Sequence, residues 1–372
     1  MILHFLTDDK FADYAIMQFS APEMQSEFVC LNTAGRMNLV ELQDEVRVMS
    51  PHSEQFATFL EGELKKYSAI ILHGMHWGWW QKEILKLVPS NVKVAWVFWG
   101  GEIYGRSDLH IKRYAPITSL LNRWHLHKNK KKKARNKGWE LPIELYRRVE
   151  YCLTSEVEEY EFAKAFLRND HMQQIWYTYY DIDATLGALK DARCNGENVI
   201  IGNSATAECN YFDVIPKIKR CLKKNQRVVL PLSYGDPWVM NSVSKYAKFF
   251  LGNAAMPLLD FMPRDEYNKI LQGCSTMIMD QYTPQAQGNI VTGLWLGMRV
   301  YVSEKSMAYQ FLRRIGCKVY SFESEFKKYK LSPLSQADMK QNREVLKEWY
   351  SKEHVTAGVK NVVRALNGHR AI

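Results

Sequence analysis

The sequence predicts an α/β protein of two domains, each built around a parallel β-sheet with crossover helices. Three observations predict it. The 372 residues exceed one ordinary domain and suit two domains of about 150–190 residues each. Short apolar runs alternate with helical stretches along the chain. The alternation begins afresh after residues 180–197, where Asp, Gly and Lys mix without periodicity, as in a linker.

In the first half, apolar runs of strand length alternate with helical stretches and define an N-terminal domain of residues 1–185. The expected strands are Ile2–Thr7, Phe28–Leu31, Ala69–His73, Val94–Trp99, Tyr151–Thr154 and Gln174–Thr178. The expected helices are Ser53–Lys66, Trp80–Lys86, Ile117–Lys128, Glu140–Arg148 and Ser155–Leu167.

The second half repeats the pattern and defines a C-terminal domain of residues 196–345. Its expected strands are Val199–Gly202, Arg227–Leu232, Thr276–Asp280 and Val300–Val302. Its expected helices are residues 207–222, 238–251, 264–273, 284–297 and 304–315, and residues 323–355 are strongly helical. The closing helices, residues 346–372, can pack back on the first domain. Two facing α/β domains create an interdomain cleft, where small-molecule sites prefer to lie.

Composition limits the class of protein. The seven cysteines are scattered without any CxxC pair, which predicts free thiols in a reducing compartment. The start of the chain lacks the features of a signal peptide, and no apolar run reaches the length of a membrane span. We therefore expect a cytoplasmic protein that is soluble or associated with a membrane.

The charge excess of +10 is concentrated in one segment, residues 123–139, which carries many Lys and Arg and no acid. Such density attracts an anionic bilayer, and flanking Trp side chains suit the headgroup layer. A solvated loop and a nucleic-acid site are the alternatives. We expect membrane docking, without nucleic acid, through Trp124, Lys130, Lys131, Lys132, Lys133, Arg135 and Trp139.

Three strand ends in the C-terminal domain carry turn residues suited to a phosphate. The first, Gly202-Asn203-Ser204, exposes backbone N–H groups before a helix, and is either a phosphate cradle or a structural turn. The second contains Tyr234 and Gly235; Tyr234 can bind a phosphate, stack on a base or fill the core.

The third strand end leads into a helix that we expect to begin with Thr283 as N-cap and Pro284 at the first position. Neutral donors and bare backbone follow at Gln285, Gln287, Gly288 and Asn289. Together the three ends outline a pocket for a nucleotide diphosphate that amides and a helix dipole hold without a metal.

Two strand ends in the N-terminal domain carry ionisable and aromatic residues. Glu102 is the candidate general base, because a carboxylate in an apolar loop has a raised pKa, and His73 and His76 are alternatives. The alternative for Glu102 is a structural hydrogen-bonding role, which is the commoner one for a lone glutamate at a strand end. Sugar rings stack on aromatic side chains, so the candidate acceptor residues are Gly74, Trp77, Trp99, Gly100 and Tyr104.

Metal and cofactor motifs are missing from the sequence. Asp181-Ile182-Asp183 superficially resembles a metal-binding DxD, but it lies in the linker and is interpreted as a turn or helix start. No HExxH, Walker A or GxSxG motif occurs. We therefore expect no cofactor and no metal.

Five segments carry a family resemblance. Ile71–Gly74, Trp99–Tyr104, Ile201–Ala205, Leu232–Gly235 and Phe261–Asn289 resemble the bacterial TDP-4-acetamido-4,6-dideoxy-D-galactose:lipid II transferases of enterobacterial common antigen synthesis, glycosyltransferase family 56. The resemblance covers nearly the whole chain. WGGEIY stands where the family has WGADLY, and GNSAT where it has a GNSGD-type loop.

The resemblance implies a GT-B fold, which is two facing Rossmann-like domains with the donor nucleotide on the C-terminal one. It implies transfer of a deoxy-acetamido sugar (Fuc4NAc) from a dTDP-sugar to a polyprenyl-diphosphate-linked glycan, at the cytoplasmic face of the bacterial inner membrane. A sugar-nucleotide enzyme such as an epimerase and a non-catalytic membrane- or nucleic-acid-binding scaffold remain alternatives.

Overall fold

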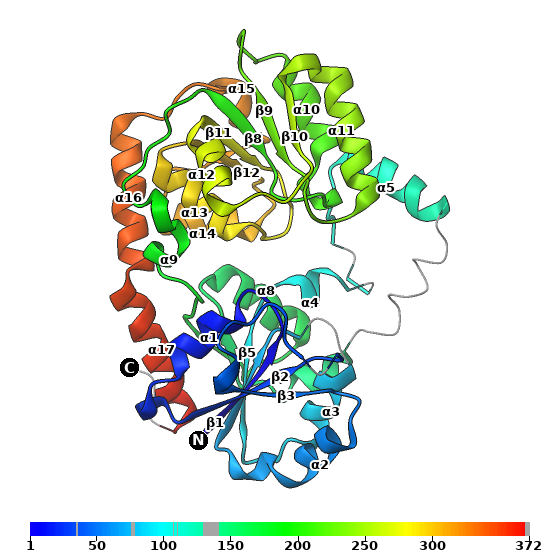
Figure 1. Cartoon of the computed structure of the whole chain (residues 1–372), viewed down its shortest axis with the longest axis vertical. Helices are drawn as coiled ribbons and strands as arrows, with labels where there is room; N and C mark the ends of the chain where they lie inside the picture. The colour runs from blue at the N-terminus through cyan, green and yellow to red at the C-terminus, as the bar shows by residue number, and fades with distance from the viewer. Residues whose placement is uncertain (35, 76–78, 107, 110, 129–140, 369–372) are drawn as a thin grey trace. The chain divides into compact units, whose positions relative to one another are not determined.

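The structure is a computed structural model that describes all residues except 35, 76–78, 107, 110, 129–140 and 369–372. It divides into two compact units (Figure 1). Unit 1 comprises residues 1–109, 135–181 and 352–372, and unit 2 comprises residues 110–134 and 182–351. Each unit holds one fully parallel sheet, so the predicted α/β class is confirmed. The unit boundaries differ from the predicted domains, because residues 110–134 belong to unit 2.

The sheet of unit 1 has the strand order β3-β2-β1-β4-β5-β6-β7, which reverses direction between β1 and β4. Such a reversal is the topological switch point beside which ligands bind in open α/β sheets. Sequence analysis missed β3, a short edge strand with a polar residue in its centre. The strands are β1 (Ile2–Thr7), β2 (Ser26–Leu31), β3 (Val46–Met49), β4 (Ala69–His73), β5 (Lys93–Val97), β6 (Tyr151–Leu153) and β7 (Gln173–Ile175).

Helices cover both faces of this sheet. Apolar side chains of α1 and α17 pack with Ile2 and Leu6 of β1 on one face. On the other face, Phe5 packs edge-on against Phe56 and Phe59 of α2. The helices of unit 1 are α1 (Ala12–Phe19), α2 (Glu54–Gly62), α3 (Trp79–Leu87), α4 (Gly101–Tyr104), α7 (Ile143–Tyr146), α8 (Val157–Leu167) and α17 (Lys352–Leu366).

A chain of hydrogen-bonded side chains lies buried beside β1 and β4. His4 Nδ1 lies 3.1 Å from His73 Nε2, and His73 Nδ1 lies 2.9 Å from the Tyr179 hydroxyl. Both imidazoles are buried. Burial lowers the pKa of His73 to about 3, and burial together with the nearby His73 lowers the pKa of His4. Both rings are therefore neutral at pH 7.

The sheet of unit 2 has the order β10-β9-β8-β11-β12-β13, with its switch point between β8 and β11. β10 was not predicted, because it contains Pro257, which is tolerated since the strand lies at the sheet edge. β13 was not predicted either, because it has only two residues. The strands are β8 (Asn198–Ile201), β9 (Val228–Pro231), β10 (Ala255–Leu258), β11 (Cys274–Met279), β12 (Arg299–Val302) and β13 (Tyr320–Ser321).

Two apolar clusters hold the helices of unit 2 on its sheet, one with α10 and α11 and the other with α9, α13 and α16. The predicted linker contributes to the second cluster, since Ile182, Leu186 and Leu189 are buried there. The helices are α5 (Pro116–Lys128), α9 (Ile182–Leu186), α10 (Tyr211–Lys219), α11 (Pro237–Leu251), α12 (Arg264–Gln272), α13 (Gln287–Leu296), α14 (Met307–Arg314), α15 (Phe326–Tyr329) and α16 (Gln336–Tyr350).

We predict that unit 1 loses stability as the pH falls below about 6.5. An unfolded histidine titrates near that value, whereas His73 in the folded protein titrates at about 3, so the unfolded chain binds protons first. Each buried histidine should lower the free energy of unfolding by up to about 1.4 kcal/mol per pH unit in this window. Urea unfolding between pH 7 and pH 5 measures the slope.

The matched control replaces both histidines by non-titrating residues, as His4→Gln with His73→Gln. Other groups with shifted pKa values are the same in both proteins, so the difference between the two slopes isolates the pair. The variant should show the shallower dependence on pH, and equal slopes would contradict the assignment.

Candidate functional site

The turn after β8 requires glycine at its first position. Gly202 has φ +64°, and a Cβ built on it would lie 2.5 Å from the Tyr211 hydroxyl oxygen. The Gly202 N–H donates to the Ile278 carbonyl at 2.9 Å, which ties the start of the turn to β11. The backbone therefore bends sharply at the carboxyl end of the central strand.

Asn203 joins the three predicted turns. Its Nδ2 donates to the Tyr234 hydroxyl at 3.4 Å, after β9, and its Oδ1 accepts from Gln281 Nε2 at 3.0 Å, after β11. The Ala205 N–H also donates to the Tyr234 carbonyl at 2.8 Å. The turns that follow β9, β8 and β11 therefore lie side by side at the switch point of unit 2.

The flanking residues of these turns differ in accessibility. Tyr234 is 58% exposed, so it does not fill the core, and that interpretation of the sequence is wrong. Ser204 is buried, and its Oγ lies 3.3 Å from Thr206 Oγ1, so its hydroxyl is not presented to a ligand. Gly235 has φ +122° and lies so close to Ala205 that an added Cβ would meet its carbonyl oxygen at 2.5 Å.

Helix α13 begins later than the sequence predicts. Its first residue is Gln287 and its N-cap is Ala286, with φ 58°, so the predicted start at Thr283 and Pro284 is wrong. Thr283 is buried and accepts a hydrogen bond from Gln285 Nε2 at 3.1 Å, which shapes the loop before the helix.

The first helical hydrogen bond of α13 runs from the Ile290 N–H to the Ala286 carbonyl. The N–H groups of Gln287, Gly288 and Asn289 precede it and have no intrahelical acceptor. An added Cβ on Gly288 would meet no described atom within 4 Å. The positive end of this ten-residue helix is therefore accessible to an anion. The Gln287 side chain itself donates to the Tyr350 hydroxyl at 3.0 Å.

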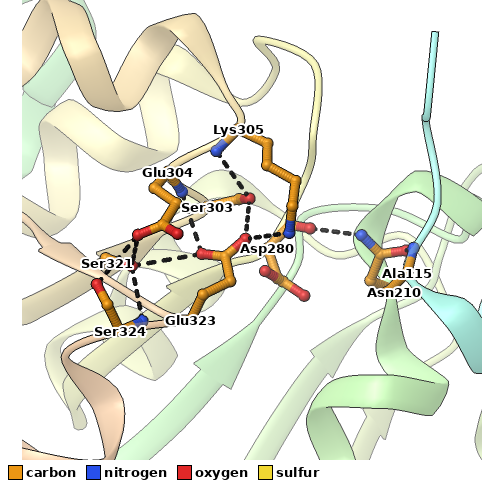
Figure 2. A network of polar contacts seen from close by, with 9 residues as sticks. All are labelled: Ala115, Asn210, Asp280, Ser303, Glu304, Lys305, Ser321, Glu323 and Ser324. Atoms are coloured by element: carbon orange, nitrogen blue, oxygen red, sulfur yellow. Dashed lines mark hydrogen bonds and ion pairs between the residues drawn. The ribbon is translucent and has the colours of Figure 1, made fainter.

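A polar network that the sequence analysis did not include lies at the ends of β11, β12 and β13 (Figure 2). Lys305 Nζ lies 2.9 Å from Glu323 Oε1 and 4.2 Å from the centre of the Tyr282 ring. Asp280 is buried, and its Oδ1 has no hydrogen-bond partner among the described residues. Burial and the carboxylate of Glu323 raise the pKa of Asp280. In the sequence, Asp280 stands at the end of an apolar strand, and this position could have identified it as a candidate site residue.

In unit 1 the prediction that His73 is a catalytic base is wrong. His73 is buried, and its two ring nitrogens lie within hydrogen-bond distance of His4 and Tyr179, so it cannot take a proton from an acceptor. His76 lies outside the described residues, as does the candidate acceptor residue Trp77.

Glu102 has a structural role in unit 1. It is buried in α4, and its Oε1 accepts from Trp96 Nε1 at 3.1 Å, from the Trp99 N–H at 3.1 Å and from the Met75 N–H at 3.4 Å. These donors join the ends of β4 and β5. The general-base role of Glu102 stays a prediction.

The other predicted acceptor residues have different surroundings. Tyr104 is buried and stacks on Phe162 with 5.3 Å between ring centres, so its assignment to the acceptor is wrong. Gly74 and Gly100 have φ +82° and +85°, and an added Cβ on either would press on the ring of Trp99 or of Tyr104 at 3.0 Å. Backbone conformation and local packing therefore explain why glycine occupies these two positions.

A half-buried aromatic cluster lies at the carboxyl ends of β1, β5 and β7 in unit 1. Phe11 packs against Trp99 with 5.1 Å between ring centres and against Tyr180 with 5.9 Å. Tyr14 meets Tyr180 edge-on at 4.8 Å. Of these residues the sequence analysis identified only Trp99.

Most of the predicted membrane-docking residues lie outside the part of the chain that the structure describes: Lys130, Lys131, Lys132, Lys133, Arg135 and Trp139. Trp124 lies on α5 and is exposed. None of the described helices combines the length and the apolar character that crossing a bilayer requires. Within the same residues, no three His, Cys, Asp or Glu side chains form a group that could hold a metal ion.

Solved structures share this fold over nearly their entire length. A glycosyltransferase from Rickettsia africae ESF-5 aligns with a TM-score of 0.64 and 12% identity, covering 99% of each chain. A sucrose-phosphate synthase from Thermosynechococcus elongatus aligns at 0.63 and 10%, covering 98% of each. WaaG, a glycosyltransferase involved in lipopolysaccharide biosynthesis, aligns at 0.55 and 7%, covering 99% of this chain and 100% of that one.

These similarities show that the chain has the GT-B fold, two Rossmann-like α/β units in succession. No protein-family model matches the sequence, and no curated protein matches it either.

We predict that Gly202→Ala destabilises unit 2. The substitution forces a left-handed backbone on alanine and presses a methyl group on Tyr211, costs of about 1–2 and about 1–3 kcal/mol. The midpoint of urea unfolding measures the loss.

Gly288→Ala is the matched control, because its Cβ meets no described atom within 4 Å. Its unfolding midpoint should not fall below that of the wild type. If Gly202→Ala unfolded at the wild-type urea concentration, the described turn would be incorrect.

Proposed function

We propose that this protein is a glycosyltransferase that holds a nucleoside-diphosphate sugar on unit 2. The observation that carries the proposal is the junction of three strand-end turns through Asn203, next to the accessible N-terminus of α13. Backbone N–H groups and a helix dipole there favour a diphosphate without a cation. The GT-B fold supports a role in sugar transfer, but a fold alone does not identify the substrate.

The same donors would act in catalysis. Negative charge develops on the diphosphate as the bond to the sugar breaks, and preorganised N–H groups stabilise that charge. Removal of one such donor typically costs about 3–4 kcal/mol of transition-state stabilisation. Of the predicted donor residues, we propose those that are not buried: Asn203, Tyr234, Gly235, Gln285, Gln287, Gly288 and Asn289.

The finer proposal follows the sequence resemblance. The donor is a dTDP-linked 4-acetamido-4,6-dideoxygalactose or a related deoxyamino sugar, and the acceptor is a polyprenyl-diphosphate-linked glycan at the inner face of the bacterial membrane. We assign the acceptor to unit 1, where the half-buried cluster of Phe11, Trp99 and Tyr180 offers apolar aromatic surface that suits a sugar ring. The reaction requires no metal in this proposal.

We predict that Gln285→Ala and Tyr234→Ala each weaken dTDP binding by about tenfold, which corresponds to about 1.4 kcal/mol. Tyr234 is exposed beside Asn203, and Gln285 shapes the loop before α13, so neither change should affect the core. Calorimetric titration of dTDP, UDP and GDP measures affinity and base preference.

The matched control is Phe249→Ala, which removes an 83% exposed aromatic side chain on α11. Its dTDP affinity should equal that of the wild type. Unchanged affinity in both site variants would remove the donor assignment, and the absence of saturable binding in the wild type would favour a scaffold. Release of free sugar without an acceptor would favour an epimerase or hydrolase.

We predict that Glu102→Gln separates structure from catalysis. The glutamine keeps an oxygen that can accept from Trp96 and Trp99, so the free energy of unfolding should stay within about 1 kcal/mol of the wild-type value. If Glu102 is the general base, turnover should fall by about 10²–10⁴-fold while dTDP affinity is unchanged. Wild-type turnover in the folded variant would end the catalytic assignment.

A further inference from the structure

Helix α5 packs on unit 2 with one face and exposes an apolar stripe on the other. On the inner face Leu121 contacts the core, and His125 stacks on Trp238 with 4.1 Å between ring centres. On the outer face Ile117 is 44% exposed, Leu120 69% and Trp124 56%. Their spacing of three and four residues places these side chains along one line of the helix.

The start of α5 is fixed firmly to unit 2. Asp213 accepts the Ile117 N–H at 2.9 Å and the Thr118 N–H at 2.8 Å, which caps the helix. Just before it, the Ala115 N–H donates to Asn210 Oδ1 at 2.9 Å, and Asn210 Nδ2 in turn donates to the Asp280 carbonyl (Figure 2). The exposed stripe therefore belongs to an anchored helix and does not result from a frayed one.

The charge around the stripe is basic. Arg123 and His127 are exposed on the same helix, Lys112 is exposed just before it, and residues 116–128 contain no Asp or Glu. An anionic surface would find cations beside an apolar stripe and no acidic group on α5 to repel it.

We propose that α5 is a membrane-docking helix that lies in the interface of an anionic bilayer, with Ile117, Leu120 and Trp124 inserted and the basic side chains at the phosphates. Interfacial helices combine an apolar face, cationic flanks and an aromatic residue at headgroup depth, and α5 carries all three. A stable protein interface needs about 20–30 residues a side, far more than this stripe supplies. The inference rests on the proposed function in one respect, since a lipid-linked acceptor lies in such a bilayer.

Vesicle sedimentation of the full-length protein tests the inference. The vesicles are pure phosphatidylcholine and phosphatidylcholine with about one third phosphatidylglycerol, at low and at physiological salt. The wild type should sediment with the anionic vesicles. Ile117→Gln with Leu120→Gln should weaken this binding at least tenfold without any change of charge. Arg123→Gln should weaken it less and mainly at low salt.

Phe249→Gln is the matched control, because it removes an even more exposed apolar side chain from another helix of unit 2 and should bind vesicles like the wild type. Equal vesicle binding by the stripe variant and the wild type overturns the inference, as does a wild type that fails to sediment. A dimeric wild type with a monomeric stripe variant and unchanged vesicle binding assigns the stripe to a second copy. Titration of dTDP in solution tests the donor site separately, so either proposal can fail alone.

Discussion

The candidate donor site depends on the side chain of Asn203. This one amide donates to Tyr234 and accepts from Gln281, so it joins the turns on both sides of the central strand β8. The junction is possible only because Gly202 takes a left-handed conformation that places Asn203 beyond the strand end. Without this amide, the main-chain bond from Ala205 to Tyr234 would still join the turns after β8 and β9, but the Tyr234 hydroxyl and Gln281 would lose their shared partner. Ordering those side chains on a ligand would then cost conformational entropy.

The two units use polar groups at their strand ends in opposite ways. In unit 1, Glu102 and His73 are buried and bonded to neighbouring donors and acceptors, so these groups stabilise the fold. In unit 2, the donors at the start of α13 face no intrahelical acceptor, and Tyr234 is exposed. Buried groups whose hydrogen bonds are already formed keep the fold rigid, whereas accessible N–H donors can form new hydrogen bonds with a ligand.

Sequence patterns predict the central strands well because their apolar runs are buried on both faces. The predicted ranges for β1 and β4 equal the observed ones. The same patterns miss the edge strands β3 and β10, which carry Arg47 and Pro257. The turns after β8, β9 and β11 were identified because glycine marks them or their flanks. The burial of His73 could not be predicted, since it depends on His4, which is 69 residues away in the chain.

The contrast between the units also bears on how each would recognise its ligand. Hydrogen bonds already occupy both ring nitrogens of His73 and the Oε1 atom of Glu102 in unit 1, and using these groups for a ligand would first require breaking those bonds at a desolvation cost. The half-buried aromatic cluster of Phe11, Trp99 and Tyr180 can contribute apolar ring surface to a ligand without the breaking of a hydrogen bond. Recognition in unit 1 should therefore depend on shape and apolar contact, which tolerates variation among glycans. In the proposed function, directed N–H donors of unit 2 would recognise the diphosphate, and their geometry would favour a phosphate over an uncharged group.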